Sequence, residues 1–199
     1  MRTLIAFILL FLSSTSCAAF SKHAVDINGQ SLTFSVPSSW GKEVGRSNGP
    51  SRSYHFFPKG QSVQQHSEIL SVYLYPDLHN NITSNQMMSM ILKKIEAPEL
   101  CKAYKYYLFY PKISPNDMTD TAALLFYCTS HKNHANGMVS YYVVKRMNNK
   151  NDIFVIYRSW QGQSFLPSES TEYHLEHMRK LAIFVQSVHL TESVAPTGP

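Results

Sequence analysis

Residues 32–40 read LTFSVPSSW, an alternating run that ends at Pro37 and is followed by Trp40. Its large apolar side chains stand at every second position up to Val36, which is the period of a strand with one buried face. Because proline cannot donate to a strand ladder, Pro37 ends this strand. The run therefore predicts a half-buried strand, and it raises the question of why a large aromatic residue follows the strand so closely.

Six further segments are rich in aromatic or β-branched residues, and most are bounded by Pro, Asn, Asp or Gly. They are residues 53–57, 69–75, 104–110, 122–129, 138–147 and 153–160. The short polar link at residues 148–152 is typical of a hairpin, and residues 133–137 supply another turn. Together these segments predict a largely antiparallel sheet of about six to seven strands.

Two segments have a helical period instead. Residues 83–95 carry apolar side chains three and four positions apart, with Ser84 or Asn85 as the expected cap and Pro98 beyond the end. Residues 168–188 form the second segment. Its expected apolar stripe is Leu175, Met178, Leu181, Ala182, Val185 and Val188. Runs of strands between two isolated helices predict an α+β fold, with the sheet flanked by both helices.

This order of elements, with a strand that ends in Val36 and Pro37, two small residues and Trp40, resembles the PsbP-like (Mog/PsbP-type) sandwich. Members of that group include a photosystem II extrinsic subunit, a nuclear-import factor and many small bacterial exported proteins. The resemblance concerns the fold from about residue 25 to residue 190. It implies that Trp40 covers the edge of the sheet after the proline.

The N-terminus has the pattern of a signal peptide. Arg2 precedes nine apolar residues at 4–12, a run too short for a membrane span, which needs about 20 apolar residues. Small residues allow cleavage after Ala18 or Ala19, while Cys17 leaves acylation of a lipoprotein as the alternative. We expect a signal peptide at 1–19, one α+β domain at 20–190, a flexible tail at 191–199, and secreted or periplasmic localisation.

Composition excludes several classes of protein. With 44% hydrophobic, 13% aromatic and 16% charged residues, the chain is not expected to be disordered. The formal net charge of +5 is scattered over the sequence without a long basic run, so we expect no nucleic-acid partner. After removal of the signal peptide we also expect no stable membrane span.

Beyond the signal peptide only Cys101 and Cys128 remain, an even number in a chain with an export pattern. If strands 104–110 and 122–129 pair in the register that sets Cys101 opposite Cys128, a disulfide is within reach. The expected bond would stabilise the fold by about 3 to 4 kcal/mol. Two buried free thiols are the alternative.

Motifs for catalysis and for metal or cofactor binding are weak. His174 and His177 are three residues apart on the second predicted helix, and His131 and His134 repeat that spacing, but neither pair completes a zinc-protease motif. Residues 162–164 lack the second glycine of a nucleophile elbow, and no glycine-rich phosphate loop is present. We therefore predict no catalytic residue, no metal site and no cofactor.

The aromatic residues are the remaining sequence feature that can indicate a binding site. Strand 104–110 has aromatic side chains on both faces, which is typical of a central strand covered on both sides. The functional alternative is that Tyr106, Tyr142, Tyr157 and Trp160 line a groove for a protein, peptide, glycan or apolar ligand.

The leading functional hypothesis is an exported, non-enzymatic binding or accessory protein that uses this aromatic surface. Such a protein could be a secreted effector that acts on a host or envelope partner. The alternatives are a secreted hydrolase whose catalytic residues are dispersed in the sequence, and a lipid-anchored envelope protein.

Overall fold

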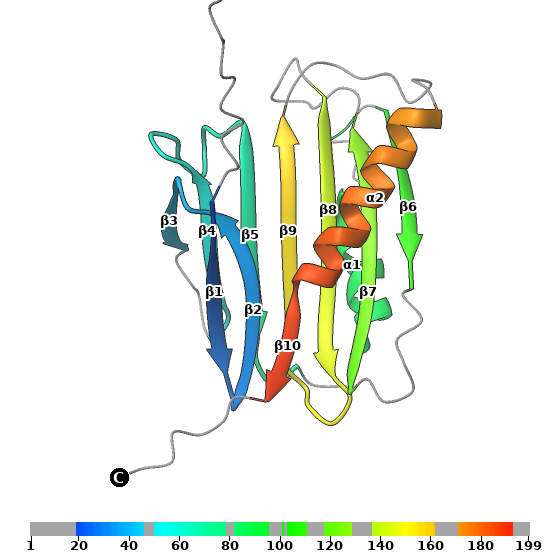
Figure 1. The fold of residues 1–199 in the computed structure, drawn as a ribbon. Coiled ribbons are helices and arrows are strands. Elements are labelled where there is room, and N and C mark those ends of the chain that lie inside the picture. Colours follow the sequence, from blue (N-terminus) through cyan, green and yellow to red (C-terminus); the bar gives the residue numbers. More distant parts are fainter. Residues whose placement is uncertain are drawn as a thin grey trace, which may run out of the picture.

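The computed structural model describes residues 19–45, 50–78, 82–95, 101, 103–110, 118–128, 137–161 and 171–192, with side chains from residue 175 onward in the last range. Ten strands and two helices lie in this part of the chain (Figure 1). The strands are β1 (Phe20–Ile27), β2 (Gln30–Pro37), β3 (Trp40–Gly45), β4 (Arg52–Pro58), β5 (Glu68–Tyr75), β6 (Tyr104–Phe109), β7 (Thr119–Cys128), β8 (Met138–Met147), β9 (Ile153–Gln161) and β10 (His189–Glu192). The helices are α1 (Ser84–Ile95) and α2 (Thr171–Ser187).

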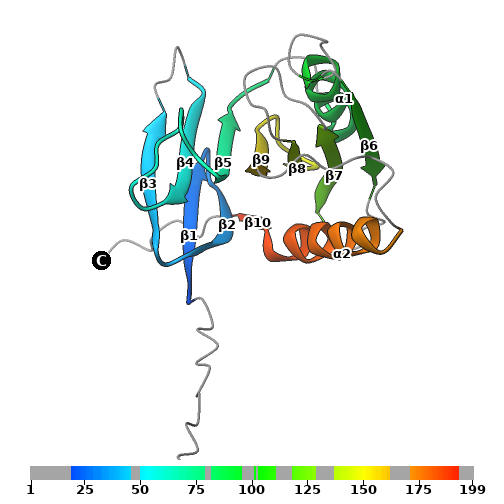
Figure 2. The ribbon, with the colours of Figure 1, turned by 90° about the horizontal axis from the view of Figure 1, so that it is seen from above.

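Two antiparallel sheets form the body of the protein. Seven strands pair in the order β3-β4-β5-β9-β8-β7-β6, and three pair in the order β1-β2-β10. Helix α1 covers one face of the seven-stranded sheet, while α2 and the three-stranded sheet lie on the opposite face (Figure 2). The α+β fold class predicted from the sequence is confirmed, and the three-stranded sheet is an addition to it.

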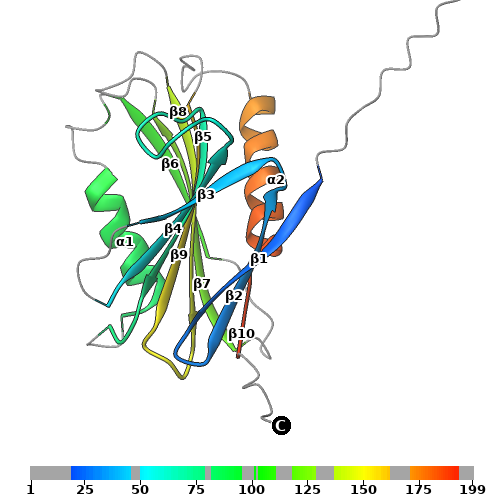
Figure 3. The same ribbon diagram turned by 90° about the vertical axis from the view of Figure 1, so that its left-hand side faces the viewer.

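The run at 32–40 is where the chain changes sheets. Pro37 is the last residue of β2 in the three-stranded sheet, and Trp40 is the first residue of β3 in the seven-stranded one. Only Ser38 and Ser39 lie between them, and Ser38 N donates to the carbonyl of Ala19 at 2.8 Å. Figure 3 shows β2 and β3 diverging from this turn. Pro37 thus ends the strand pairing of β2, and Trp40 begins the strand pairing of β3.

The structure corrects the expected role of Trp40. It does not cover the sheet from outside but belongs to β3, itself an edge strand, where it pairs with Pro58. Its partly buried ring packs against the apolar core between the two sheets. Trp40 therefore links the sheet edge to the core.

A second correction concerns strand 104–110. Its aromatic residues on both faces indicated a central position, yet β6 is the outermost strand and pairs with β7 alone. The central positions belong to β5, β9 and β8, whose side chains are buried on both faces over most of their length. An exposed lysine such as Lys105, the second residue of β6, is typical of an edge strand.

Helix α1 begins one residue after its cap, which is Thr83 and not the expected Ser84 or Asn85. The hydroxyl of Thr83 accepts from Gln86 N at 3.2 Å, and Gln86 Oε1 accepts from Thr83 N at 2.8 Å. This reciprocal pair is a capping box. The next backbone amide, of Ser84, donates to Oδ2 of Asp120 on β7 at 2.7 Å, so the sheet itself helps to place the start of the helix.

Helix α2 turns a slightly different face to the core than the expected stripe. Leu175 is 50% exposed, and Ala182 is also exposed. Among its described side chains, at residues 175–187, His177, Leu181 and Phe184 are buried. The final strand β10 reaches Glu192, so Thr191 and Glu192 pair with β2 although the sequence placed them in the tail. Most of the tail, residues 193–199, lies outside the described residues, as do 1–18 with the expected signal peptide.

Candidate functional site

The face of the seven-stranded sheet that carries α1 also holds a cavity of about 280 Å³. Helix α1 packs over β7 and β8 through Met87, Met88 and Leu92, and its last residue, Ile95, reaches the cavity wall. The described residues therefore cover the sheet beyond the end of α1 only in part. Thirteen of the described residues line the cavity: His55, Val63, His66, Ile69, Ser71, Tyr73, Ile95, Cys101, Phe126, Met138, Tyr142, Tyr157 and Gln161.

Strand register builds the floor of this cavity. His55 on β4 is the Cα partner of Ser71 on β5, Ser71 is the partner of Tyr157 on β9, and Tyr157 is the partner of Tyr142 on β8. Directly paired residues point to the same face of a sheet. Four polar side chains that are far apart in the sequence thus form one row across four strands.

Two tyrosines form the centre of that row. The rings of Tyr142 and Tyr157 lie 4.7 Å apart at 34°, and the Tyr157 hydroxyl donates to the sulfur of Met138 at 3.7 Å. Burial raises the pKa of Tyr142 well above its ordinary value, and it raises the pKa of Tyr157 as well. Both phenols are therefore neutral hydrogen-bonding groups in surroundings that disfavour charge.

Two histidines, His55 and His66, form the other side of the cavity. Nδ1 of His55 lies 2.9 Å from Oγ of Ser71, and its ring meets Tyr73 edge to face at 5.7 Å. Burial lowers the pKa of His55, while Glu43 on β3 opposes this effect and His66 adds to it. His55 is thus held neutral near pH 7.

His66 is oriented by bonds at both ring nitrogens. Its Nδ1 donates to the carbonyl of Val63 at 2.8 Å, and its Nε2 lies 3.2 Å from the side-chain amide nitrogen of Gln161. An amide nitrogen only donates, so Nε2 accepts and the proton of the neutral ring is on Nδ1. The loop that carries Val63 and His66 is thereby attached to the end of β9.

The contact between Ser71 and His55 is the part of the site that most resembles a catalytic group. A nucleophilic serine also needs donors for the oxyanion that its attack creates. Ser71 is 1% exposed in the middle of β5, and the backbone of β5 is paired on both sides with β4 and β9. Within the described residues, the strand around Ser71 therefore offers no free pair of amides for an oxyanion.

The structure divides the four predicted ligand-binding residues between two faces. Tyr142 and Tyr157 line the cavity, while Tyr106 lies on the same face of the sheet in edge strand β6 and is 38% exposed. Trp160 lies on the opposite face, where its ring meets Tyr141 at 4.8 Å. Successive side chains of a strand alternate, so residues 157 and 160 cannot share a face.

A short row of stacked rings connects Tyr106 to the cavity. Tyr106 and Tyr104 stack at 6.4 Å, and Tyr104 stacks on Phe126 at 5.8 Å. Phe126 is part of the cavity wall. The exposed aromatic surface of β6 is thus continuous with the cavity.

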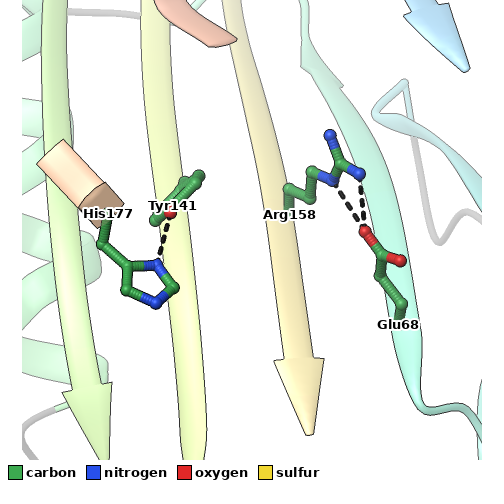
Figure 4. A network of polar contacts seen from close by, with 4 residues as sticks. All are labelled: Glu68, Tyr141, Arg158 and His177. Carbon is green, nitrogen blue, oxygen red and sulfur yellow. Dashed lines mark hydrogen bonds and ion pairs between the residues drawn. The ribbon is translucent and has the colours of Figure 1, made fainter. Parts of the chain in front are cut away.

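Trp160 belongs to a polar and aromatic cluster on the face covered by α2. Arg158 donates from Nε and from one terminal nitrogen to Oε1 of Glu68, at 2.9 and 2.6 Å, and its guanidinium lies 4.7 Å from the centre of the Trp160 ring. The Tyr141 hydroxyl and Nδ1 of His177 are 2.6 Å apart, a contact that joins β8 to α2 (Figure 4). His177, one of the histidines noted in the sequence, therefore has a packing role; the side chains of His131, His134 and His174 lie outside those described.

The predicted disulfide between Cys101 and Cys128 is present, with 5.7 Å between the two Cα atoms. The register from which it was derived is wrong, because Cys128 pairs with Tyr104 and Cys101 precedes β6. Cys101 is also one of the residues that line the cavity.

Six polar or aromatic lining residues were not identified from the sequence: His55, His66, Ser71, Tyr73, Phe126 and Gln161. His55, Ser71 and Tyr73 were inside predicted strands, so a correct strand pairing would have brought them together. No local signal marks His66 or Gln161, which meet only through the tertiary structure.

Comparisons with known proteins concern the fold. No protein-family model matches this chain, and no curated protein matches it. Among solved structures, the cyanobacterial PsbP (CyanoP) of Synechocystis sp. PCC 6803 is 12% identical, with 89% of this chain and 96% of that chain covered and a TM-score of 0.48. The Ran-binding protein Mog1p of Saccharomyces cerevisiae is 10% identical, with 86% and 96% covered and a TM-score of 0.48. The PsbP-like resemblance stated from the sequence is thus found again as a likeness of fold, and it transfers no functional residue.

Two further observations apply to the described part of the chain. No group of three or more His, Cys, Asp or Glu side chains there could hold a metal ion. Neither α1 nor α2 has the length and apolar composition that a membrane crossing requires.

Proposed function

We propose that this protein is a non-enzymatic binding protein whose site is the tyrosine-lined cavity, and that it takes up a neutral, ring-bearing group of a partner. The observation that carries the proposal is the composition of the cavity. Its described lining combines aromatic rings, aliphatic side chains and neutral hydrogen-bonding groups, and no Lys, Arg, Asp or Glu is among these described residues. Binding sites for small apolar molecules have this composition.

The electrostatics of the lining favour a neutral ligand. Burial raises the pKa of Tyr142 and lowers the pKa of His55, so in both cases the uncharged form is favoured. The same surroundings would disfavour an ionised ligand, because the lining residues that the structure describes offer no opposite charge to replace its water.

The volume of the cavity limits the size of the group. A cavity of about 150 Å³ binds benzene, and this one is about 280 Å³. A two-ring aromatic group with one hydroxyl would fit that space, with the hydroxyl directed to Tyr142, Tyr157 or Gln161. The rings of Tyr104 and Tyr106 extend the aromatic surface beyond the cavity, so the partner that presents this group can be a larger protein, peptide or glycan.

Export is part of the proposal. The positively charged and apolar N-terminal pattern, together with cleavage after Ala18 or Ala19, would leave β1 whole, since β1 begins at Phe20. A buried disulfide is common in proteins of oxidising compartments. We therefore infer a secreted or periplasmic protein, with lipid anchoring at Cys17 as the alternative form, and a host or envelope partner.

Binding can be tested with 2-naphthol as the probe and the methyl group of Met138 as the NMR reporter, because Met138 lines the cavity. We expect saturable shifts of the Met138 methyl and smaller ones for Met90, which is 55% exposed on α1. Naphthalene-2-sulfonate, the same rings with a charge, should bind at least about tenfold more weakly. Equal affinity for the two probes, or no shift of Met138, would overturn the proposal.

Site variants make the test specific. Tyr157→Phe removes one hydroxyl from the cavity and should weaken 2-naphthol binding about three- to tenfold. Tyr54→Phe makes the same change on the opposite face of the sheet and should leave the affinity unchanged.

The contact between Ser71 and His55 favours a hydrolase as the second candidate function. In that case Ser71 Oγ would attack an ester carbonyl while His55 took up its proton, the alcohol would leave with that proton, and water would then hydrolyse the acyl-serine. Turnover of 4-nitrophenyl acetate should then be lost in Ser71→Ala. Equal rates for the parent protein and this variant would favour the binding function.

A further inference from the structure

Strand β6 forms one edge of the seven-stranded sheet. Among the described strands, only β7 pairs with it. Alternate residues of an edge strand direct their backbone N–H and C=O groups outward, where a further strand can pair with them. Tyr104 is 39% exposed and Tyr106 is 38% exposed, so the strand lies at the surface of the protein. This edge therefore has the hydrogen-bonding groups that an extended peptide requires.

A groove of about 300 Å³ lies beside this edge, on the face of the sheet that carries α2. Phe109 of β6 and its strand partner Ala123 of β7 belong to the sheet side of the groove. The other described lining residues are Tyr110 and, on α2, Met178, Leu181, Ala182, Val185 and Gln186. Since a cavity of about 150 Å³ binds benzene, the groove has room for one large aliphatic or aromatic side chain.

The groove follows from the way α2 crosses the sheet obliquely (Figure 1). His177 and Phe184 of α2 contact Tyr141 on the inner strand β8. Met178 and Ala182 lie on the adjoining side of the helix and line the groove together with the end of β6. Ala182 is exposed, so a side chain that comes from outside the protein can reach this side of α2.

Lys105 gives the same edge a positive charge. It precedes Phe109 by four residues, so both lie on one face of β6, about 13 Å apart along the strand. Its Nζ lies 5.3 Å from the centre of the Tyr107 ring, and no carboxylate of the described residues forms an ion pair with it. An acidic side chain of an added strand, placed opposite Lys105, would supply a partner of opposite charge.

The two edges of the large sheet do not provide such a strand in a second copy of this chain. Strand β6 contains no acidic residue. Strand β3, the other edge, contains Glu43, but Gly41 and Gly45 are its neighbours on the same face, and they bring no side chain to the groove. The surface thus favours a segment of another protein.

We propose that β6 is a strand-addition site for an extended segment of a partner protein. The segment pairs with the edge of β6, inserts one large apolar side chain into the groove between β6 and α2, and places an acidic side chain, four residues along, opposite Lys105. Main-chain hydrogen bonds supply affinity, while the groove and Lys105 supply specificity. The groove lies on the opposite face of the sheet from the tyrosine-lined cavity, so this inference does not rest on the proposed function.

The first experiment uses the peptide acetyl-FTTVET-amide, in which phenylalanine and glutamate are four residues apart. We expect saturable NMR shifts of the Met178 methyl, which lines the groove, and little change at the Met138 methyl in the cavity. The absence of a shift at Met178 would overturn the proposal.

Two further peptides test strand pairing. Each carries N-methyl groups on alternate residues, so that in one peptide the methylated nitrogens face β6 and in the other they face away. We expect the first to lose binding and the second to bind within about threefold of the parent peptide. Equal effects in both peptides would overturn strand addition.

A pair of variants on α2 tests the groove. Ala182→Phe should fill the groove and weaken peptide binding at least about fivefold. Ile183→Phe, at a position that is 66% exposed, is the matched control and should leave the affinity unchanged. The Met147 methyl, buried on the same face of the sheet, reports whether the fold is retained. An unchanged affinity in Ala182→Phe would overturn the proposal, and so would dimers of the protein that this variant loses, because a second copy would then be the occupant.

A charge exchange tests the register. At low ionic strength, Lys105→Glu should weaken binding of acetyl-FTTVET-amide about threefold and strengthen binding of acetyl-FTTVKT-amide by a similar factor. If the parent protein and Lys105→Glu have the same preference between the two peptides, the acidic side chain does not lie opposite Lys105 and the inference fails.

Discussion

Asn28 donates a hydrogen bond from Nδ2 to Oδ1 of Asp152 at 2.8 Å, although 124 residues separate them in the chain. Gln30 Nε2 donates to the other carboxylate oxygen, and the backbone amide of Asp77 donates to Oδ1 at 3.1 Å. Asp152 is 3% exposed and directly precedes β9. A single buried carboxylate thus joins the β1-β2 hairpin of the small sheet to the end of the large one.

Replacement of Asp152 should separate the two sheets at this point. Asp152→Ala leaves three donors without their acceptor, so we expect the free energy of unfolding to fall by about 3 kcal/mol in urea denaturation. Asp26→Ala, at an exposed position of β1, is the control and should change it by less than about 0.5 kcal/mol. Similar small effects of both changes would show that the carboxylate does not join the sheets.

Truncation of Trp40 should also reduce the stability of the fold. Its ring is partly buried against the core, and the guanidinium of Arg158 lies 5.9 Å from its centre. We expect Trp40→Ala to reduce the free energy of unfolding by about 2 to 3 kcal/mol, less than for a fully buried tryptophan. Ser39→Ala, in the turn before it, should have little effect. If the denaturation midpoint of Trp40→Ala equals that of the parent, the ring does not stabilise the fold and is free for binding.

Alkaline pH should weaken the fold through Tyr142. Burial raises its pKa above the ordinary value of 10.0, so above that pH the unfolded chain loses a proton that the folded protein retains. Its contribution to stability is therefore complete below about pH 10 and is lost as the pH rises further. We expect Tyr142→Phe to flatten this decline. Measurements near pH 8, where the phenol is protonated in both states, serve as the control. Identical slopes for both proteins above about pH 10 would contradict the burial of this phenol.

Acidic pH should weaken the fold through His55. Burial lowers its pKa below 6.5, so below that pH the unfolded chain binds a proton that the folded protein does not. The stability that His55 contributes is present above pH 6.5 and is lost as the pH falls below it. We expect His55→Gln to lose part of the difference in unfolding free energy between about pH 7.5 and about pH 5.5. If the difference in unfolding free energy is as large in His55→Gln as in the parent, the effect comes from other groups. His23 is one of them, because burial lowers its pKa too.

Export and the disulfide can be checked on the mature protein by intact mass and thiol labelling. We expect a chain that begins at Ala19 or Phe20, carries no acyl group, and has no free thiol when it is denatured without reductant. A diacylglyceryl adduct on Cys17 would establish the lipid-anchored form instead. Labelling of two cysteines would contradict the disulfide.

The local pattern of side chains was enough to predict both helices, seven of the strands and the hairpin at 148–152. These features depend on periods of two and of about 3.6 residues, which are properties of neighbouring residues. Two of the missed strands had weak local signals: the apolar residues of β1 do not alternate regularly with its polar ones, and β10 is only four residues long. Their pairing with β2 depends on contacts that are distant in the sequence.

The candidate site could be located only from the tertiary structure. The sequence identified Tyr142 and Tyr157 as aromatic candidates, but only strand pairing placed them beside each other and placed Trp160 on the opposite face. Likewise, the even number of cysteines predicted the disulfide, whereas the register that sets Cys128 opposite Tyr104 came from the folded sheet. The reason is physical: side-chain alternation determines which residues of one strand share a face, but the cavity arises from the register between strands and from how far α1 extends over the sheet.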